Sequence, residues 1–156
     1  STELTLFKNH QAHTSKSFNI GSIRLLMDMV SDYNWSDMKR WVKDISAQSP
    51  AGLSLIGSGG NINKYCKLLM KEYGEPLNSS EIFHLYKSLK SMSTEERIQQ
   101  LFLNPDRADV IVPAGKIFTS VMKWSGAETV FVPKIGLSDG VVTMLYDQMK
   151  LEKAFV

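Results

Sequence analysis

Residues 51–73 constrain the fold of this chain more than any other part of its sequence. The apolar run at 51–56 predicts a short buried strand, and it leads directly into the turn Gly57-Ser58-Gly59-Gly60. Apolar side chains then recur at helical spacing as far as Gly74, a residue typical of a helix stop. A strand, a glycine turn and a helix in this order predict an α/β unit whose helix begins beside the end of the strand.

Other regular elements are expected on both sides of this unit. The alternation of polar and apolar residues over 2–8 predicts a strand, which residues 13–19 extend into a hairpin. Strands alternating with helices favour a parallel sheet, and the hairpin makes that sheet mixed. The long helix is expected to be disturbed at Pro113 and Gly115. The remaining expected elements are helices over 23–30, 38–45, 79–90, 94–103 and 105–124, a strand over 129–132, and a last helix after 138.

Length and composition exclude several classes of protein. The 156 residues suit a single domain, and 18 Lys and Arg against 16 Asp and Glu lack the basic excess of a nucleic-acid-binding domain. No apolar run approaches the length of a membrane span, and the first residues do not resemble a signal peptide. The single cysteine excludes an intramolecular disulfide and fits a reducing compartment. We therefore expect a soluble cytoplasmic domain without nucleic-acid or membrane partners.

The glycine turn is the most informative candidate site. Gly57, Gly59 and Gly60 expose backbone N–H groups at a helix N-terminus, where the helix dipole favours an anion. Their spacing matches neither the dinucleotide fingerprint nor the Walker A loop, so it names no ligand. A tight connection that needs positive φ angles explains the same glycines equally well, and both interpretations stay open.

Other polar residues carry weaker signals. Ser1, Thr2 and Glu3 offer two hydroxyls and a carboxylate, yet alone they resemble an ordinary polar terminus. Arg107 and Asp109 are two residues apart, so on a helix they do not face each other. A solvated helix start is the simpler interpretation there, with Arg107 as an anion clamp the alternative.

The histidines, the cysteine and the large apolar residues favour structural roles. His10 and His13 lack a third metal ligand at suitable spacing, so a solvated hairpin is expected. His84 falls within a helix and suits a surface or packed position, and Cys66 lies on an apolar stripe as a buried thiol. The Trp and Met residues follow helical stripes and are expected in the core.

Taken together, the motifs resemble the exopolyphosphatase/guanosine pentaphosphate phosphohydrolase (Ppx/GppA) family. Residues 1–4 are similar to the end of its Gly-Gly-Gly-Ser-Thr-Glu phosphate loop, and residues 18–25 to its Gly-x-x-Arg stretch after a hairpin. Residues 57–60 fall at its second glycine turn. Residues 93–97, followed by 107–111 and Gly115, resemble its C-terminal block.

The resemblance implies an actin-like ATPase (ribonuclease H-like) domain of the α/β class, with a mixed sheet, an opening hairpin and flanking helices. Residues 1–156 would be the second, C-terminal domain of a two-domain phosphatase. The first domain of the same polypeptide, which carries its own phosphate motif and the catalytic glutamate, is absent from this chain. The strand before Ser1 would lie between the hairpin and the strand at 51–56.

The implied activity is removal of a terminal phosphate from inorganic polyphosphate or guanosine pentaphosphate. Glu3 would be catalytic, holding Mg²⁺ or orienting the attacking water. The general base would come from the missing domain, so the fragment alone is expected to be inactive. The residues implied to bind phosphate are Ser1, Thr2, Gly57, Ser58, Gly59, Gly60 and Arg107.

Two alternatives and one departure accompany this hypothesis. The chain could be a non-catalytic actin-like domain that binds nucleotide or phosphate, or half of a sugar or acetate kinase, although such kinases lack the block at 107–111. Ser138-Asp139-Gly140 stands where the family usually has Arg-Glu-Gly, so a basic contact is missing. A homodimer is a further option.

Overall fold

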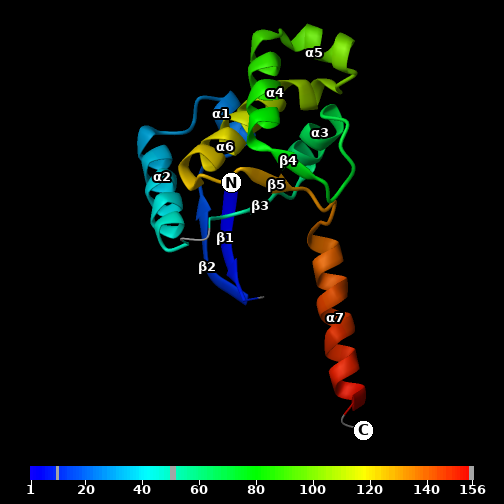
Figure 1. The fold of residues 1–156 in the computed structure, drawn as a ribbon. Helices are drawn as coiled ribbons and strands as arrows, with labels where there is room; N and C mark the ends of the chain where they lie inside the picture. The colour runs from blue at the N-terminus through cyan, green and yellow to red at the C-terminus, as the bar shows by residue number, and fades with distance from the viewer. Residues whose placement is uncertain (10, 50–51, 155–156) are drawn as a thin grey trace.

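The computed structural model describes residues 1–9, 11–49 and 52–154. A helical body carries an opening hairpin, and one long helix stands away from it at the C-terminal end (Figure 1). The elements in chain order are β1 (Thr2–Lys8), β2 (Gln11–Phe18), α1 (Ser22–Leu26), α2 (Asp32–Ala47), β3 (Leu55–Ile56), α3 (Gly60–Leu68), β4 (Pro76–Asn78), α4 (Ser79–Ser91), α5 (Thr94–Leu101), α6 (Pro105–Ser125), β5 (Thr129–Phe131) and α7 (Leu137–Ala154).

The strands form two sheets within the described residues. β1 and β2 make the expected antiparallel hairpin, with an irregularity between Leu6 and Phe7. The second sheet has the order β3-β5-β4, in which β5 runs parallel to β3 and antiparallel to β4. The mixed character of this sheet therefore comes from β4, which the sequence pattern did not predict, and not from the hairpin. Each of β1 and β3 has one edge without a partner strand in the described part of the chain.

Helix α6 organises the core. On one side it packs against α3, α4 and the three-stranded sheet, around the buried side chains of Tyr65, Ile111 and Met122. Toward the hairpin and α2, Ile117 and Val121 join Phe18 in a second apolar cluster. The helix is continuous through Pro113, so the disturbance expected there is wrong. The apolar packing on both sides of the helix outweighs the single backbone hydrogen bond that a proline removes.

Two helices end earlier than their apolar periodicity suggests. Residues 23–30 were expected to be helical, but α1 stops at Leu26 because Asp28 adopts a left-handed conformation with φ 54°. The helix at 61–73 likewise stops at Leu68, with Met70 left-handed at φ 53°, so Gly74 is not its stop. In both turns backbone N–H groups close onto the last carbonyls, which is the usual helix-ending geometry, here without glycine.

Helix α5 begins with a capping box. Ser93 Oγ accepts a hydrogen bond from the Glu96 amide at 3.1 Å, and the Glu96 carboxylate accepts one from the Ser93 amide at 2.7 Å. The buried Arg97 that follows donates to the carbonyls of Leu89, Met92 and Ala108. These bonds tie α5 to α4 and α6 and satisfy the guanidinium without a carboxylate.

The expected core role of the methionines is only partly correct. Met38 and Met122 are buried, whereas Met27 and Met70 are exposed, because α1 is short and Met70 lies in the turn after α3.

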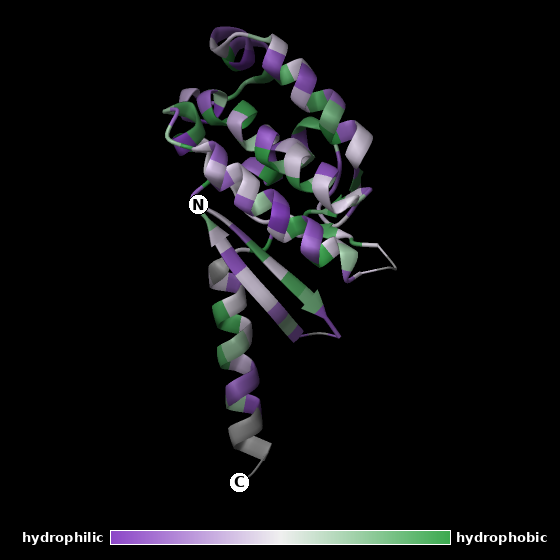
Figure 2. Ribbon diagram, turned by 90° about the vertical axis from the view of Figure 1, so that its left-hand side faces the viewer, coloured by the Kyte–Doolittle hydropathy of each residue, from purple (hydrophilic) through white to green (hydrophobic). Residues whose placement is uncertain are grey.

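The apolar side chains of α7 are exposed as well, along a helix that extends from the body (Figure 2). Exposed apolar residues on α7 are Val141, Val142, Met144, Leu145, Tyr146 and Met149. Among the helices of the described ranges, none has the length and apolarity to cross a membrane.

Candidate functional site

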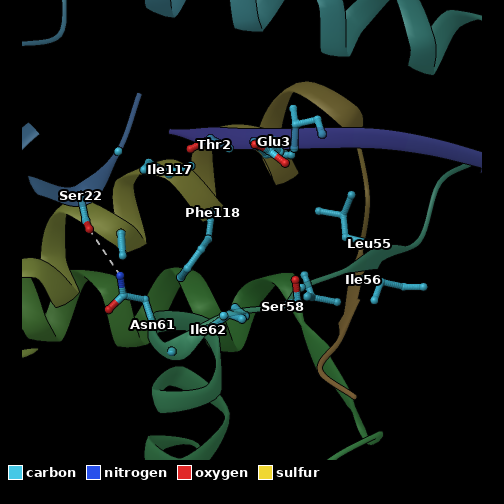
Figure 3. A pocket seen from close by; sticks show the side chains of 18 of the residues that line it. Thr2, Glu3, Ser22, Leu55, Ile56, Ser58, Asn61, Ile62, Ile117 and Phe118 are labelled. Carbon is cyan, nitrogen blue, oxygen red and sulfur yellow. Dashed lines mark hydrogen bonds between the residues drawn. The ribbon is translucent and has the colours of Figure 1, made fainter. Parts of the chain in front are cut away.

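A cavity of about 430 Å³ lies where the start of β1, the glycine turn and α6 meet (Figure 3). The first four residues of the chain form one wall, and β3 with residues 57–60 forms the opposite wall. Ile117, Phe118 and Val121 of α6 supply an apolar floor. The cavity is therefore polar at the two loops and apolar beneath them.

The structure brings together two segments that are more than fifty positions apart in the sequence. Ser1, Thr2 and Glu3 line the same cavity as residues 57–60, although β1 and β3 belong to different sheets. Gly21, which follows the hairpin, lets the chain pass close to Ser1. A side chain there would bring its Cβ within 3.0 Å of the Ser1 backbone nitrogen.

The polar residues of β1 differ in their available hydrogen-bonding groups. Thr2 Oγ1 donates to the Ile20 carbonyl at 2.6 Å, so its hydroxyl hydrogen is already committed. Glu3 is exposed at the cavity, and its carboxylate forms no hydrogen bond or ion pair with the described residues. It is also the only acidic residue that the described part of the cavity wall contains. The carboxylate is therefore free to meet a cation or a water.

The glycine turn is shaped by both its backbone and its packing. The Gly57 amide donates to the Phe131 carbonyl at 2.8 Å, and a Cβ at Gly57 would lie 2.8 Å from Ile62 Cγ1. Gly59 has φ +112° and precedes α3 without a side-chain cap. The tight connection and the open helix start, two interpretations that the sequence left open, thus occur in the same loop. Uncapped N–H groups at a helix start are suited to binding an anion.

Arg107 does not line the cavity. Its guanidinium lies against Gly60, where an added Cβ would be 3.1 Å from both terminal nitrogens. Arg107 Nη1 donates to Asn61 Oδ1 at 2.6 Å, and Asn61 itself lines the cavity. In this geometry the Asn61 side chain stands between the Arg107 guanidinium and the cavity.

Asn61 and Ser22 are cavity residues that the sequence analysis missed. Asn61 Nδ2 donates to Ser22 Oγ at 3.5 Å across the cavity edge (Figure 3). Asn61 directly follows the glycine turn, and Ser22 directly follows Gly21. Each of them directly follows a glycine at the start of a helix, and this pattern could have identified them in the sequence.

The remaining candidates lie outside the cavity wall. Cys66 is buried on α3, as expected, and burial raises the pKa of its thiol. His13 and His84 are exposed, and His10 lies outside the described residues. No cluster of three or more His, Cys, Asp or Glu side chains suited to a metal occurs in the described ranges.

Asp139, which replaces the expected family glutamate, accepts a hydrogen bond from the Gly136 amide at 2.8 Å and caps α7.

The sequence and the fold were compared with known proteins. The model of the Ppx/GppA phosphatase family matches residues 1–150, and no curated protein sequence matches the chain. A Ppx/GppA family member from Aquifex aeolicus superposes with a TM-score of 0.74 at 18% identity, covering 94% of this chain and 53% of its own. An exopolyphosphatase from Cytophaga hutchinsonii gives a TM-score of 0.72 at 19% identity, covering 94% and 54%. The chain thus spans about half the length of these proteins, and its α/β architecture is the actin-like fold expected from the sequence.

Proposed function

This chain belongs to the Ppx/GppA phosphatase family, and from that premise we propose that it is part of a phosphohydrolase. The reaction is removal of the terminal phosphate from inorganic polyphosphate or guanosine pentaphosphate. The observation that carries the proposal is the single cavity shared by the Ser1–Glu3 segment and the glycine turn. Both segments offer groups suited to phosphate oxygens at one place, although they are distant in the sequence.

Phosphate binding is assigned to backbone amides and free hydroxyls. The N–H groups of Gly59 and Gly60 belong to the start of α3, which has no side-chain cap, and the Ser58 side chain is exposed beside them. On the opposite wall, the Ser1 hydroxyl is the better donor, since the Thr2 hydroxyl already donates to Ile20. Thr2 retains its oxygen lone pairs and contributes to the shape of the loop.

Glu3 is the residue through which Mg²⁺ would be held. Mg²⁺ is usually bound by one or two carboxylates together with substrate phosphates and waters, and the unpaired carboxylate of Glu3 suits that pattern. When bound, the cation neutralises charge on the phosphate oxygens. Glu3 without a cation would orient the attacking water through its free oxygens.

The general base is proposed to lie in a preceding domain of the same polypeptide, so that residues 1–156 form the second domain. Glu3, assigned to the cation or the water, is the only acidic residue in the described cavity wall, so no second carboxylate is present there to take the proton. Similar solved structures are about twice as long as this chain, which supports a further domain. The unpaired edges of β1 and β3 and the apolar floor between them suit a strand supplied by that domain.

The test is a phosphate-release assay on the full-length protein with Mg²⁺, using polyphosphate and guanosine pentaphosphate as separate substrates. Release of orthophosphate from either substrate is expected and would assign the preference. Binding of both compounds without release would favour the alternative, a non-catalytic phosphate-binding domain. Transfer of phosphate from ATP to a sugar or acetate, without hydrolysis of the two proposed substrates, would contradict the proposal and identify a kinase.

A further inference from the structure

The first turns of three helices lie next to one another, and a short hydrogen-bonded chain links them. Ser22 opens α1, Asn61 is the second residue of α3, and Arg107 is the third residue of α6. Arg107 Nη1 donates to Asn61 Oδ1 at 2.6 Å. Asn61 Nδ2 donates to Ser22 Oγ at 3.5 Å, the bond drawn in Figure 3. Ser22 and Asn61 line the cavity, whereas Arg107 lies behind Asn61.

The chemistry of the guanidinium determines which way the Asn61 amide faces. A guanidinium carries only donors, so it can bond the amide oxygen but not the amide nitrogen. With its oxygen held by Arg107, Asn61 must turn its NH₂ group toward Ser22 and the cavity. The bond to Ser22 is long, and an NH₂ group has two hydrogens, so donor capacity remains for a ligand.

Arg107 is held in place by the glycine turn. Gly60 leaves room for the guanidinium, since any Cβ there would lie 3.1 Å from Nη1 and Nη2. Arg107 is half-buried, and no carboxylate of the described residues forms an ion pair with it. Its positive charge therefore adds to the potential at the start of α3, where an anion would be stabilised.

We propose that Asn61 donates a hydrogen bond from Nδ2 to a phosphate oxygen of the substrate, and that Arg107 is a positioning residue acting through it. This inference rests on the proposed function for the identity of the ligand. Arg107 holds the Asn61 amide in its orientation and adds to the positive potential at the start of α3. The phosphate itself is contacted by Asn61.

A double-mutant cycle in the full-length protein tests the proposal. The variants are Asn61→Ala, Arg107→Gln and the double substitution, with KM and kcat measured for phosphate release and Kd measured for inorganic tripolyphosphate. Asn61→Ala is expected to raise KM and Kd by roughly tenfold to a hundredfold, the scale of one hydrogen bond to a charged group. Arg107→Gln is expected to weaken binding by a smaller factor. The double variant should be weaker than Asn61→Ala only by the part of that factor that comes from the lost charge, and therefore by less than the product of the two single effects.

Asn63→Ala is the matched control on the same helix. Asn63 is outside the cavity wall, and its buried Oδ1 has no hydrogen-bond partner in the described residues, so its removal should leave KM and Kd unchanged. Arg107→Lys, which keeps the charge and one donor, should bind more tightly than Arg107→Gln. Thermal midpoints of all variants establish that they are folded.

The outcomes separate this inference from the proposed function. If the wild-type protein releases no phosphate but binds tripolyphosphate, and Asn61→Ala weakens that binding, the phosphohydrolase proposal fails and the inference stands. Multiplicative effects of the two single substitutions would show that Arg107 contacts the ligand independently, and would overturn its positioning role. Unchanged KM and Kd in folded Asn61→Ala, or no binding of tripolyphosphate by the wild-type protein, would overturn the inference itself.

Discussion

Single residues at the cavity have distinct roles even where they are neighbours in sequence. Thr2 uses its hydroxyl hydrogen to hold the chain after the hairpin, through the Ile20 carbonyl. The Glu3 carboxylate lies at the cavity and has no partner among the residues that the structure describes. The first residue thus stabilises the wall of the site, and the second is free for chemistry.

Glu3 is expected to be the most sensitive position of this chain for turnover. Glu3→Gln in the full-length enzyme should lower kcat by roughly a hundredfold or more, the scale of removing one preorganised electrostatic element. Steady-state phosphate release at saturating Mg²⁺ measures the effect. Glu128→Gln, the same change at an exposed position outside the cavity, is the control and should leave kcat unaltered. Near-normal turnover of Glu3→Gln would remove this carboxylate from the mechanism.

Cys66 provides a residue-scale prediction about pH. Burial raises the pKa of its thiol above the ordinary value of 9.0, while the thiol of the unfolded chain keeps that value. Below pH 9 the thiol is protonated in both states, so its contribution to the free energy of unfolding is constant. Above pH 9 only the unfolded thiol loses its proton, so stability falls as the pH rises.

Urea unfolding at about pH 8 and about pH 10, compared between the wild-type protein and Cys66→Ala, isolates this contribution. The wild-type protein should lose more stability over that interval, because Cys66→Ala removes the titrating group. Tyr65, whose pKa is also raised by burial, is present in both proteins, so its effect on stability does not enter the difference between them. Equal losses would mean that the Cys66 thiol ionises as readily in the folded state as in the unfolded chain.

At the scale of elements, α6 supports both apolar clusters and the floor of the cavity. The glycine in its middle is needed for packing, although glycine weakens an isolated helix. A Cβ at Gly115 would overlap the Tyr65 hydroxyl and approach Tyr86 Cδ2 to 2.6 Å. Tyr65 in turn donates from its hydroxyl to the Ile111 carbonyl at 3.4 Å, so it cannot move away freely.

Gly115→Ala is therefore expected to destabilise the protein by about 1–3 kcal/mol, since overpacking outweighs the gain in helix propensity. Gly140→Ala in α7 is the matched substitution, because nothing lies within 4 Å of the added Cβ. It should stabilise its helix by about 0.5–1 kcal/mol. Differential scanning calorimetry of both variants measures the opposite shifts. A stabilising Gly115→Ala would show that Tyr65 and Tyr86 yield to the methyl group.

At the scale of the whole molecule, the described residues leave strand edges and an apolar helix surface uncovered. β1 and β3 each have a free edge beside the cavity, and the apolar side chains of α7 are exposed. Figure 1 shows the hairpin and α7 extending from the same end of the helical body. These features agree with a chain that spans about half the length of similar structures.

Residues 1–156 are accordingly expected to bind phosphate or Mg²⁺ at best and to hydrolyse no polyphosphate. Each buried backbone group without a partner costs roughly 1–3 kcal/mol, against a total stability of about 5–15 kcal/mol. In the proposed two-domain arrangement, the preceding part of the polypeptide supplies both the general base and the strand between β1 and β3. A phosphate-release assay on purified 1–156 beside the full-length enzyme is the measurement. Comparable specific activity would contradict the two-domain mechanism.

Local sequence alone determined the hairpin, the strand–glycine turn–helix unit, the capping box at Ser93 and the long helix from Pro105. These features depend on periodicity, caps and glycine, which act within a few residues. Local signals also placed Ser1–Glu3 at the start of one strand and the glycine turn at the end of another, and both segments line the cavity although their strands belong to different sheets. The same signals failed where a helix ended at a non-glycine residue, such as Asp28 or Met70.

Only the tertiary structure decided which side chains serve the cavity. β4 has three residues and depends on pairing with β5, so it carries no periodicity that could be detected. The family resemblance implies that Arg107 binds phosphate, and the structure places its guanidinium against Gly60 and Asn61, nearly fifty positions away and outside the cavity wall. Side-chain orientation of this kind is set by long-range packing and by donor–acceptor matching between elements. Neither is encoded in the spacing of residues along one element.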